Sequence, residues 1–151
     1  MGYDIYTSLP DAKQAEKFAR KYGYGYLFDY NRAKTMDELT TRTGIDESAT
    51  YAGDNRVYFR ANIWGMNEVR RYFTDLFNEL PATQREEKYQ LFNDFIEAIS
   101  WNDGRHVKAQ DILTILQTIQ YFGQDVGQTE LTEEFIEYME IASTLDGFLV
   151  W

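Results

Sequence analysis

Apolar side chains recur at helical spacing through the second half of the chain. The members of each stripe stand three or four residues apart, which places them on one side of a helix. The stripes are Val69, Tyr72, Phe73, Leu76, Phe77 and Leu80; Leu91, Phe92, Phe95, Ile96 and Ile99; Ile112, Ile115, Leu116, Ile119 and Phe122; and Phe135, Met139 and Ala142. This pattern predicts four helices, of which the first follows Gly65 and ends at Pro81.

Short polar signals set the expected boundaries of these helices. Thr83 and Glu86 have the spacing of a capping box for the second helix, and Thr132 is the expected N-cap of the last one. Between the second and third helices, residues 101–104 read WNDG. They predict a tight turn, because asparagine and aspartate before glycine favour one.

The first half of the chain favours strands and loops. Residues 2–7 alternate and are rich in β-prone side chains, so they predict a short strand, and residues 56–64 predict another that Gly65 ends. Residues 11–22 have the pattern of a charged helix, and the glycines and tyrosines after it suggest an extended segment. Residues 148–151 are apolar and suit either a strand or a docked tail.

Segregation of strands from helices along the chain indicates an α+β fold, with short N-terminal and central strands and a mainly helical C-terminal part. The length of 151 residues predicts a single domain, residues 1–151.

The absence of cysteine excludes disulfides and thiolate metal sites. No apolar run approaches the ~20 residues of a membrane span, and no signal peptide is recognisable. We therefore expect a cytoplasmic protein with no membrane partner.

The distribution of charge narrows the class of partner. A net charge of -10 argues against non-specific nucleic-acid binding, so we expect no nucleic-acid partner. The last basic residue is Lys108, and the chain beyond it carries eight acidic side chains and no lysine or arginine. This acidic third is either a solvated surface that keeps the protein soluble or a patch that meets a basic partner. Homo-oligomerisation is compatible with both interpretations.

The chain holds few of the residue sets that catalysis needs. His106 is the only histidine, so a zinc site built from several imidazoles is excluded. No phosphate-binding glycine loop and no G-x-S-x-G nucleophile motif occurs. Carboxylates are plentiful, but their spacing selects no pair for metal binding or acid–base catalysis. We therefore expect no catalytic residue, no metal and no cofactor, and an enzyme is the less favoured class.

One largely apolar segment carries polar groups that need an explanation. Residues 58–66 read YFRANIWGM, and in a strand successive side chains face opposite sides. One face would then carry Tyr58, Arg60, Asn62 and Trp64. A guanidinium, an amide and two aromatic rings could hold a phosphate or carboxylate and stack a base, so we predict a ligand site there. The structural alternative is that Arg60 pairs with an internal acid, such as Asp4 or Asp103.

A second polar cluster follows the predicted turn. Arg105 and His106 stand shortly before the third helix. We predict that they assist the ligand site as anion donors, because a helix N-terminus itself attracts anions. Turn chemistry alone explains Asn102 and Asp103.

Three motifs occur in order along the chain: MGYDIY at its start, then YFRANIW, then NDGRHV. In this the sequence resembles a group of short bacterial and phage proteins of unknown function, whose patterns are MG-x-D-V/I-Y, YFRNN-x-W and NDG-x-x-I/V. The chain departs from these patterns at Ala61, at Lys108 and in a long insertion over residues 11–55. The resemblance implies a setting in a bacterial cytoplasm, with a phage genome as one source. It also implies that four residues lie close to one another: Asp4, Arg60, Asn62 and Asp103.

These observations lead us to predict a non-enzymatic binding protein that captures a small anionic, nucleotide-like ligand. The predicted site residues are Tyr58, Arg60, Asn62, Trp64, Arg105 and His106, with Asp4 and Asp103 in support. In a phage-encoded protein, such capture would sequester a host defence signal. One alternative is an acidic inhibitor that binds a host protein through the C-terminal third of the chain. A second alternative is a metal-dependent enzyme built on Asp4 and Asp103.

Overall fold

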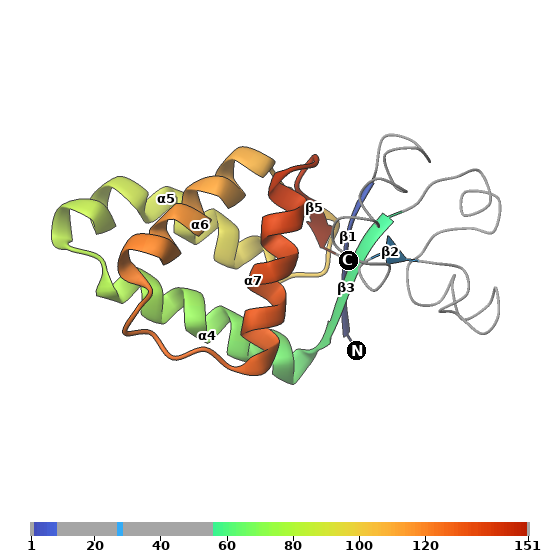
Figure 1. Ribbon diagram of the computed structural model, residues 1–151, viewed down its shortest axis with the longest axis horizontal. Coiled ribbons are helices and arrows are strands. Elements are labelled where there is room, and N and C mark those ends of the chain that lie inside the picture. Colours follow the sequence, from blue (N-terminus) through green and yellow to red (C-terminus); the bar gives the residue numbers. More distant parts are fainter. Residues whose placement is uncertain (1, 9–26, 29–55, 151) are drawn as a thin grey trace.

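The computed structural model of the protein describes residues 2–8, 27–28 and 56–150. Their elements are, in chain order, β1 (Gly2–Ser8), β2 (Leu27–Phe28), β3 (Arg56–Asn62), α4 (Ile63–Glu79), α5 (Ala82–Ala98), β4 (Arg105–Val107), α6 (Ala109–Phe122), α7 (Glu130–Ser143) and β5 (Phe148–Val150). Figure 1 shows the helices gathered on one side of the strands. The predicted α+β fold is thus confirmed. The helix predicted over residues 11–22 lies outside the described residues.

The sheet has the first strand at its centre. Its strand order is β2-β3-β1-β5-β4, and every neighbouring pair is antiparallel. β1 and β3 pair along their full length, from Gly2 opposite Asn62 to Ser8 opposite Arg56. Because β5 also pairs with β1, strands from the two ends of the described chain lie side by side.

Alternate positions of the sheet face the helices. Tyr3 and Ile5 of β1 are buried, and so are their cross-strand partners on β3, Ala61 and Phe59. Val150 of β5 stands opposite Ile5 and is fully buried. This alternation follows from the pleat of a β-strand, so one face of the sheet forms a wall of the core.

Two helical hairpins cover that wall. α4 packs against α5, α6 packs against α7, and α4 and α7 also contact each other and the sheet. Aromatic rings fill the space between these layers. The ring centroid of Phe135 on α7 lies 5.3 Å from that of Phe59 and 6.0 Å from that of Phe148. The ring centroid of Phe73 on α4 lies 4.9 Å from that of Phe95 on α5, so the aromatic core also extends between the two helices of the α4–α5 hairpin.

Three of the helix starts differ from the predicted ones, and that of α4 lies at Ile63 rather than after Gly65. α5 has Pro81 as its N-cap and no side chain caps it, so the capping box predicted at Thr83 does not form. α7 is capped by Thr129, whose hydroxyl accepts a hydrogen bond from the backbone N–H of Thr132 at 3.2 Å. Thr132 is itself buried within the helix. Both threonines can cap a helix, and packing of the hydrophobic face decides which of them stands at its start.

The chain after α5 bends and then forms an edge strand. Residues 101–104 bend as predicted, with Gly104 at a positive φ of 87°. The three residues of β4 follow, which the sequence pattern does not reveal, and they pair with β5. Such a short strand has too few alternating positions to be recognised, and its pairing with β5 is a tertiary contact. Residues 148–150 form β5, whereas Trp151 lies outside the described residues.

Gly147 makes the bend between α7 and β5. Its φ of 75° is a backbone conformation that side chains disfavour. A Cβ atom at this position would lie 1.9 Å from the carbonyl oxygen of Val107 on the neighbouring strand. The backbone N–H of Gly147 donates to the carbonyl of Ala142 at 3.1 Å, which closes the end of the helix. The position of β5 therefore depends on a glycine.

Two buried tyrosines make the stability of the folded protein depend on pH in the alkaline range. Burial raises the pKa of Tyr138 well above its ordinary value of about 10, and it also raises the pKa of Tyr72, whose hydroxyl accepts a hydrogen bond from Gln128. In the unfolded chain both phenols ionise near the ordinary value. Above that pH the folded state binds more protons than the unfolded state. The stability contribution is thus fully present below about pH 10 and is lost as the pH rises toward the folded pKa values.

Gly147→Ala is expected to lower the free energy of unfolding by about 2 kcal/mol or more, because it adds backbone strain and a clash with Val107. Urea denaturation followed by circular dichroism measures the change. Gly127→Ala is the matched control. Its Cβ would meet no atom within 4 Å, so its effect should stay within about 0.5 kcal/mol. Equal effects of the two substitutions would contradict this account of the bend.

Tyr138→Phe is expected to flatten much of the loss of stability that begins near pH 10, because the variant loses the more deeply buried of the two phenols and keeps only that of Tyr72. The measurement is the free energy of unfolding in urea at successive pH values from 8 upward (about one step per half unit). Tyr121→Phe serves as the control, since Tyr121 is 76% exposed and its phenol meets water in both states. An unchanged slope in Tyr138→Phe would show that another group controls the alkaline transition.

Candidate functional site

Segments from three of the sequence motifs meet at one corner of the fold. The register of β1 and β3 sets Gly2 opposite Asn62 and Asp4 opposite Arg60. The loop after α5 reaches the same place, because the side-chain amide of Asn102 donates a hydrogen bond to the carbonyl of Gly2 at 3.4 Å. We call this region the motif corner and define it as residues 2–4, residues 62–70 and residues 99–103.

Asn62 ends a strand and starts a helix. Its side-chain oxygen accepts a hydrogen bond from the backbone N–H of Gly65 at 2.8 Å, which makes Asn62 the N-cap of α4. The strand predicted to run through Trp64 therefore ends two residues earlier, at Asn62. An asparagine at this position stabilises the first turn of a helix, and that interaction ends the extended conformation. Trp64 stands in this first turn and is 75% exposed, rather than in line with the side chains of β3.

Tyr58 and Arg60 belong to β3, but their side chains lie outside the described part of the protein. The backbone register places Arg60 directly across from Asp4. Asp4 is half-buried and takes part in an interaction of its own. The proximity of Asp4, Arg60 and Asn62 that the resemblance implies is therefore present at the level of the backbone.

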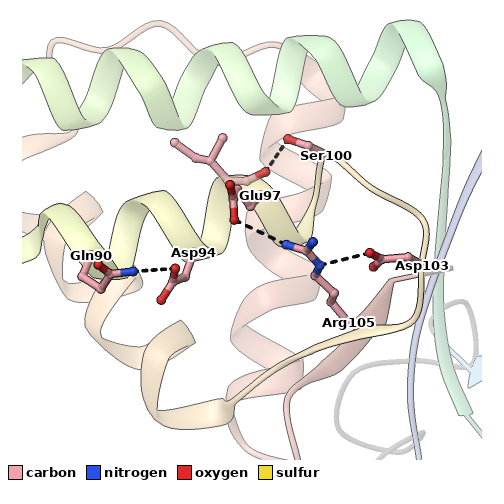
Figure 2. A network of polar contacts seen from close by, with 7 residues as sticks. Gln90, Asp94, Glu97, Ser100, Asp103 and Arg105 are labelled. Atoms are coloured by element: carbon pink, nitrogen blue, oxygen red, sulfur yellow. Dashed lines mark hydrogen bonds and ion pairs between the residues drawn. The ribbon is translucent and has the colours of Figure 1, made fainter.

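Arg105 already has two acidic partners. Its Nε atom lies 3.1 Å from a carboxylate oxygen of Asp103, and its Nη1 atom lies 3.5 Å from a carboxylate oxygen of Glu97. Figure 2 shows the guanidinium between these two side chains, which come from the loop and from the end of α5. Exposed ion pairs contribute little to stability, but the two carboxylates neutralise the charge of Arg105. Arg105 therefore ties α5 to β4, and an incoming anion would have to compete with two carboxylates.

His106 is directed to a different neighbour. Its Nε2 atom lies 2.6 Å from the carbonyl oxygen of Asp146, so that nitrogen carries the proton and donates the hydrogen bond. This contact joins β4 to the bend before β5. The structure thus does not bring His106 together with Asn62 and Trp64 as the sequence prediction grouped them.

Arg70 is the cation that the structure places in the motif corner. It is half-buried on α4, and its Nη1 atom donates a hydrogen bond to the carbonyl of Ile99 at 3.0 Å. Its Nη2 atom donates to the side-chain oxygen of Asn67. The guanidinium carbon lies 5.6 Å from the ring centroid of Tyr3, within the range of a cation–π contact. Within the described residues, all of these partners are neutral and no carboxylate forms an ion pair with Arg70.

The same contacts hold the loop of the motif corner in place. The hydroxyl of Tyr3 donates a hydrogen bond to the carbonyl of Ser100 at 2.9 Å, next to the carbonyl that Arg70 binds. Trp101 follows and is 61% exposed. The corner therefore contains an oriented guanidinium, and its residues also include two exposed tryptophans, Trp64 and Trp101.

This arrangement suits recognition of an anion that carries a flat ring. An arginine has more N–H donors than the two hydrogen bonds of Arg70 use, so donors remain for an oxyanion. Indole rings stack on bases and other flat groups. Arg70 is not among the site residues predicted from the sequence, although its position in the hydrophobic pattern is a signal. It stands four residues after Met66 and three before Phe73, which places it on the buried flank of α4.

Two surface hollows lie away from the motif corner. They have volumes of about 280 Å³ and 340 Å³, and both are lined by α5 and α6. His106 lines the first of them, whereas no residue of the corner lines either. In the part of the chain that the structure describes, no three histidine, aspartate or glutamate side chains gather as metal ligands.

Asn62→Ala is expected to lower the free energy of unfolding by about 1 kcal/mol, because α4 loses its N-cap. Asn62→Ser should restore most of the loss, since a serine hydroxyl can accept the same hydrogen bond. Urea denaturation of the three proteins measures both effects. If Asn62→Ala were as stable as the wild-type protein, the cap would be unimportant, and the amide would be available for the ligand role predicted from the sequence.

No described helix is long and apolar enough to cross a membrane. Comparison of the chain with protein-family models, with curated proteins and with solved structures finds no match.

Proposed function

We propose that this protein is a non-enzymatic binding protein that captures a small anionic, nucleotide-like ligand at the motif corner. Arg70 binds the anionic group, and Trp64 and Trp101 provide stacking surface for its ring. The observation that carries the proposal is the state of Arg70: its guanidinium is oriented by neutral acceptors and has no carboxylate partner among the described residues.

The neutral surroundings of Arg70 favour an anion from outside. A half-buried charge is costly when its hydrogen bonds are incomplete, so an oxyanion that accepts the remaining N–H groups gains a charge-assisted bond of about 1.5–3 kcal/mol. The contacts to Ile99 and Asn67 hold the side chain in one orientation. Less conformational entropy is therefore lost when the ligand binds.

The two exposed tryptophans support a ligand with a flat ring. Each base that stacks on an aromatic side chain contributes about 1–3 kcal/mol, and stacking tolerates different bases. A nucleotide combines such a ring with a phosphate. The resemblance to short phage proteins suggests a role for its capture, namely sequestration of a host defence signal.

The alternative of an acidic inhibitor has a weaker basis. The acidic side chains of α7 are exposed and lie opposite its buried stripe, as the sequence predicts. A solvated helix surface has the same appearance, and no described contact selects a basic partner for it. For the alternative of a metal-dependent enzyme built on Asp4 and Asp103, the described residues offer no cluster of three possible metal ligands.

Nucleotide binding can be measured by isothermal titration calorimetry and by thermal unfolding. The probes are AMP, ATP, a cyclic dinucleotide and inorganic phosphate. At ~100 times Kd, a bound nucleotide should stabilise the protein by about 2.7 kcal/mol. Phosphate alone should bind more weakly than the nucleotides, because it cannot stack.

Paired variants then locate the site. Arg70→Gln should weaken binding at least tenfold, or about 1.4 kcal/mol, whereas Arg71→Gln should leave it unchanged because Arg71 is exposed and outside the hydrogen-bonded set. Trp64→Ala should also weaken binding, with Tyr121→Ala as a control of equal exposure on α6. Absence of binding across the whole panel, or equal losses in the variants and their controls, would refute the proposal.

A further inference from the structure

A shallow groove separates α5 from α6. α5 packs on α4 and α6 packs on α7, but contacts between α5 and α6 themselves are sparse. The two hollows described above lie in this gap, and Figure 1 shows the two helices next to each other. The larger hollow lies between the start of α5 and the end of α6, and the smaller one lies between the opposite ends. The helices are therefore antiparallel, and the hollows follow one another along a single groove.

The smaller hollow has an apolar floor with polar sides, whereas the larger hollow has mostly polar sides around one half-buried phenylalanine ring. Leu91, Phe95 and Val107 line the smaller hollow, and Phe122 lines the larger one. Leu91 and Phe122 remain half-buried. Apolar floors with polar rims are typical of surfaces that bind another protein segment.

The spacing of the hollows favours a helix as the occupant. Phe95 and Asp111 line one hollow, while Lys88 and Thr118 line the other, so corresponding residues on each helix stand seven positions apart. Seven residues of helix span about 10.5 Å, and residues i and i+7 of a third helix lie on one face at the same spacing. An extended strand repeats on one face at about 6.6 or 13 Å and matches the hollows less well.

The charges along the groove are arranged in opposite signs at its two ends. The smaller hollow is lined by the carboxylates of Asp94 and Asp111. The larger hollow is lined by Lys88, whose ammonium group donates to the neutral side chain of Gln84 at 2.7 Å. In the described part of the chain, no ion pair neutralises any of these three groups. A complementary occupant carries a basic residue at one end and an acidic residue at the other.

We infer that the α5–α6 groove binds an amphipathic helix of a partner protein. The helix places two large apolar side chains, at positions i and i+7, in the two hollows. A basic residue beside the first meets Asp94 and Asp111, and an acidic residue beside the second meets Lys88. This site is separate from the motif corner and does not depend on the function proposed for it.

The test uses synthetic helical peptides and the full-length protein. One peptide carries leucine at positions i, i+3 and i+7, with lysine at one end and glutamate at the other. The second peptide has glutamine at both charged positions. The chain has no cysteine, so Gln117→Cys in the groove can be labelled at a single site with an environment-sensitive dye. Glu133→Cys on the exposed side of α7 provides the control label.

The charged peptide should bind and change the signal of the groove label while leaving the control label unaffected. It should bind about fivefold more tightly than the neutral peptide, since two rim pairs are involved. The triple variant Asp94→Asn, Asp111→Asn and Lys88→Gln should remove that difference, and Leu91→Glu should abolish binding of both peptides.

Three outcomes would overturn the inference. The first is the absence of any signal change with either peptide. The second is equal binding of the charged and neutral peptides to the wild-type protein. The third is a change of the groove label with protein concentration alone, which would assign the groove to a second copy of the chain.

Discussion

The ring of Phe135 is the contact through which the layers of this protein are joined. It packs against aromatic rings from two strands and two helices, namely Phe59, Phe73, Tyr138 and Phe148. Such pairs add about 0.5–1.5 kcal/mol each beyond the burial of their area. Because β3 continues into α4 without a loop, holding Phe59 and Phe73 against one ring sets the angle between strand and helix. The motif corner lies at that junction and takes its shape from it.

The motif corner retains a charge where the core would favour an apolar group. Arg70 lies between Tyr3 and the carbonyl of Ile99, and its hydrogen bonds compensate part of the cost of burying its guanidinium. An ion pair would neutralise it more fully, as Asp103 and Glu97 neutralise Arg105 nearby. The two arginines therefore differ in their partners: Arg105 joins two elements through carboxylates, whereas the partners of Arg70 among the described residues are neutral.

The motif corner and the α5–α6 groove arise from different kinds of contact, the first long-range in sequence and the second local. The motif corner depends on pairing between β1 and β3, whose partners stand far apart in the sequence. The groove depends on two local hairpins, each of which buries one side of its helices and leaves α5 and α6 loosely joined. The ligand and the partner helix that we propose would therefore bind without sharing a residue.

Hydrophobic periodicity alone determined the four helices, the first strand and the α+β class. The reason is that an element buried on one side must carry its apolar residues at the spacing of that side. Capping was less certain, since Thr129 and Thr132 are both able to cap and packing selects one. The sequence also indicated the region of the candidate site through Asn62 and Trp64. It did not indicate Arg70, whose surroundings depend on one carbonyl, that of Ile99, and one ring, that of Tyr3, from two distant segments. Only the tertiary structure brings such partners together, because the chain encodes which residues are buried more directly than which polar groups meet.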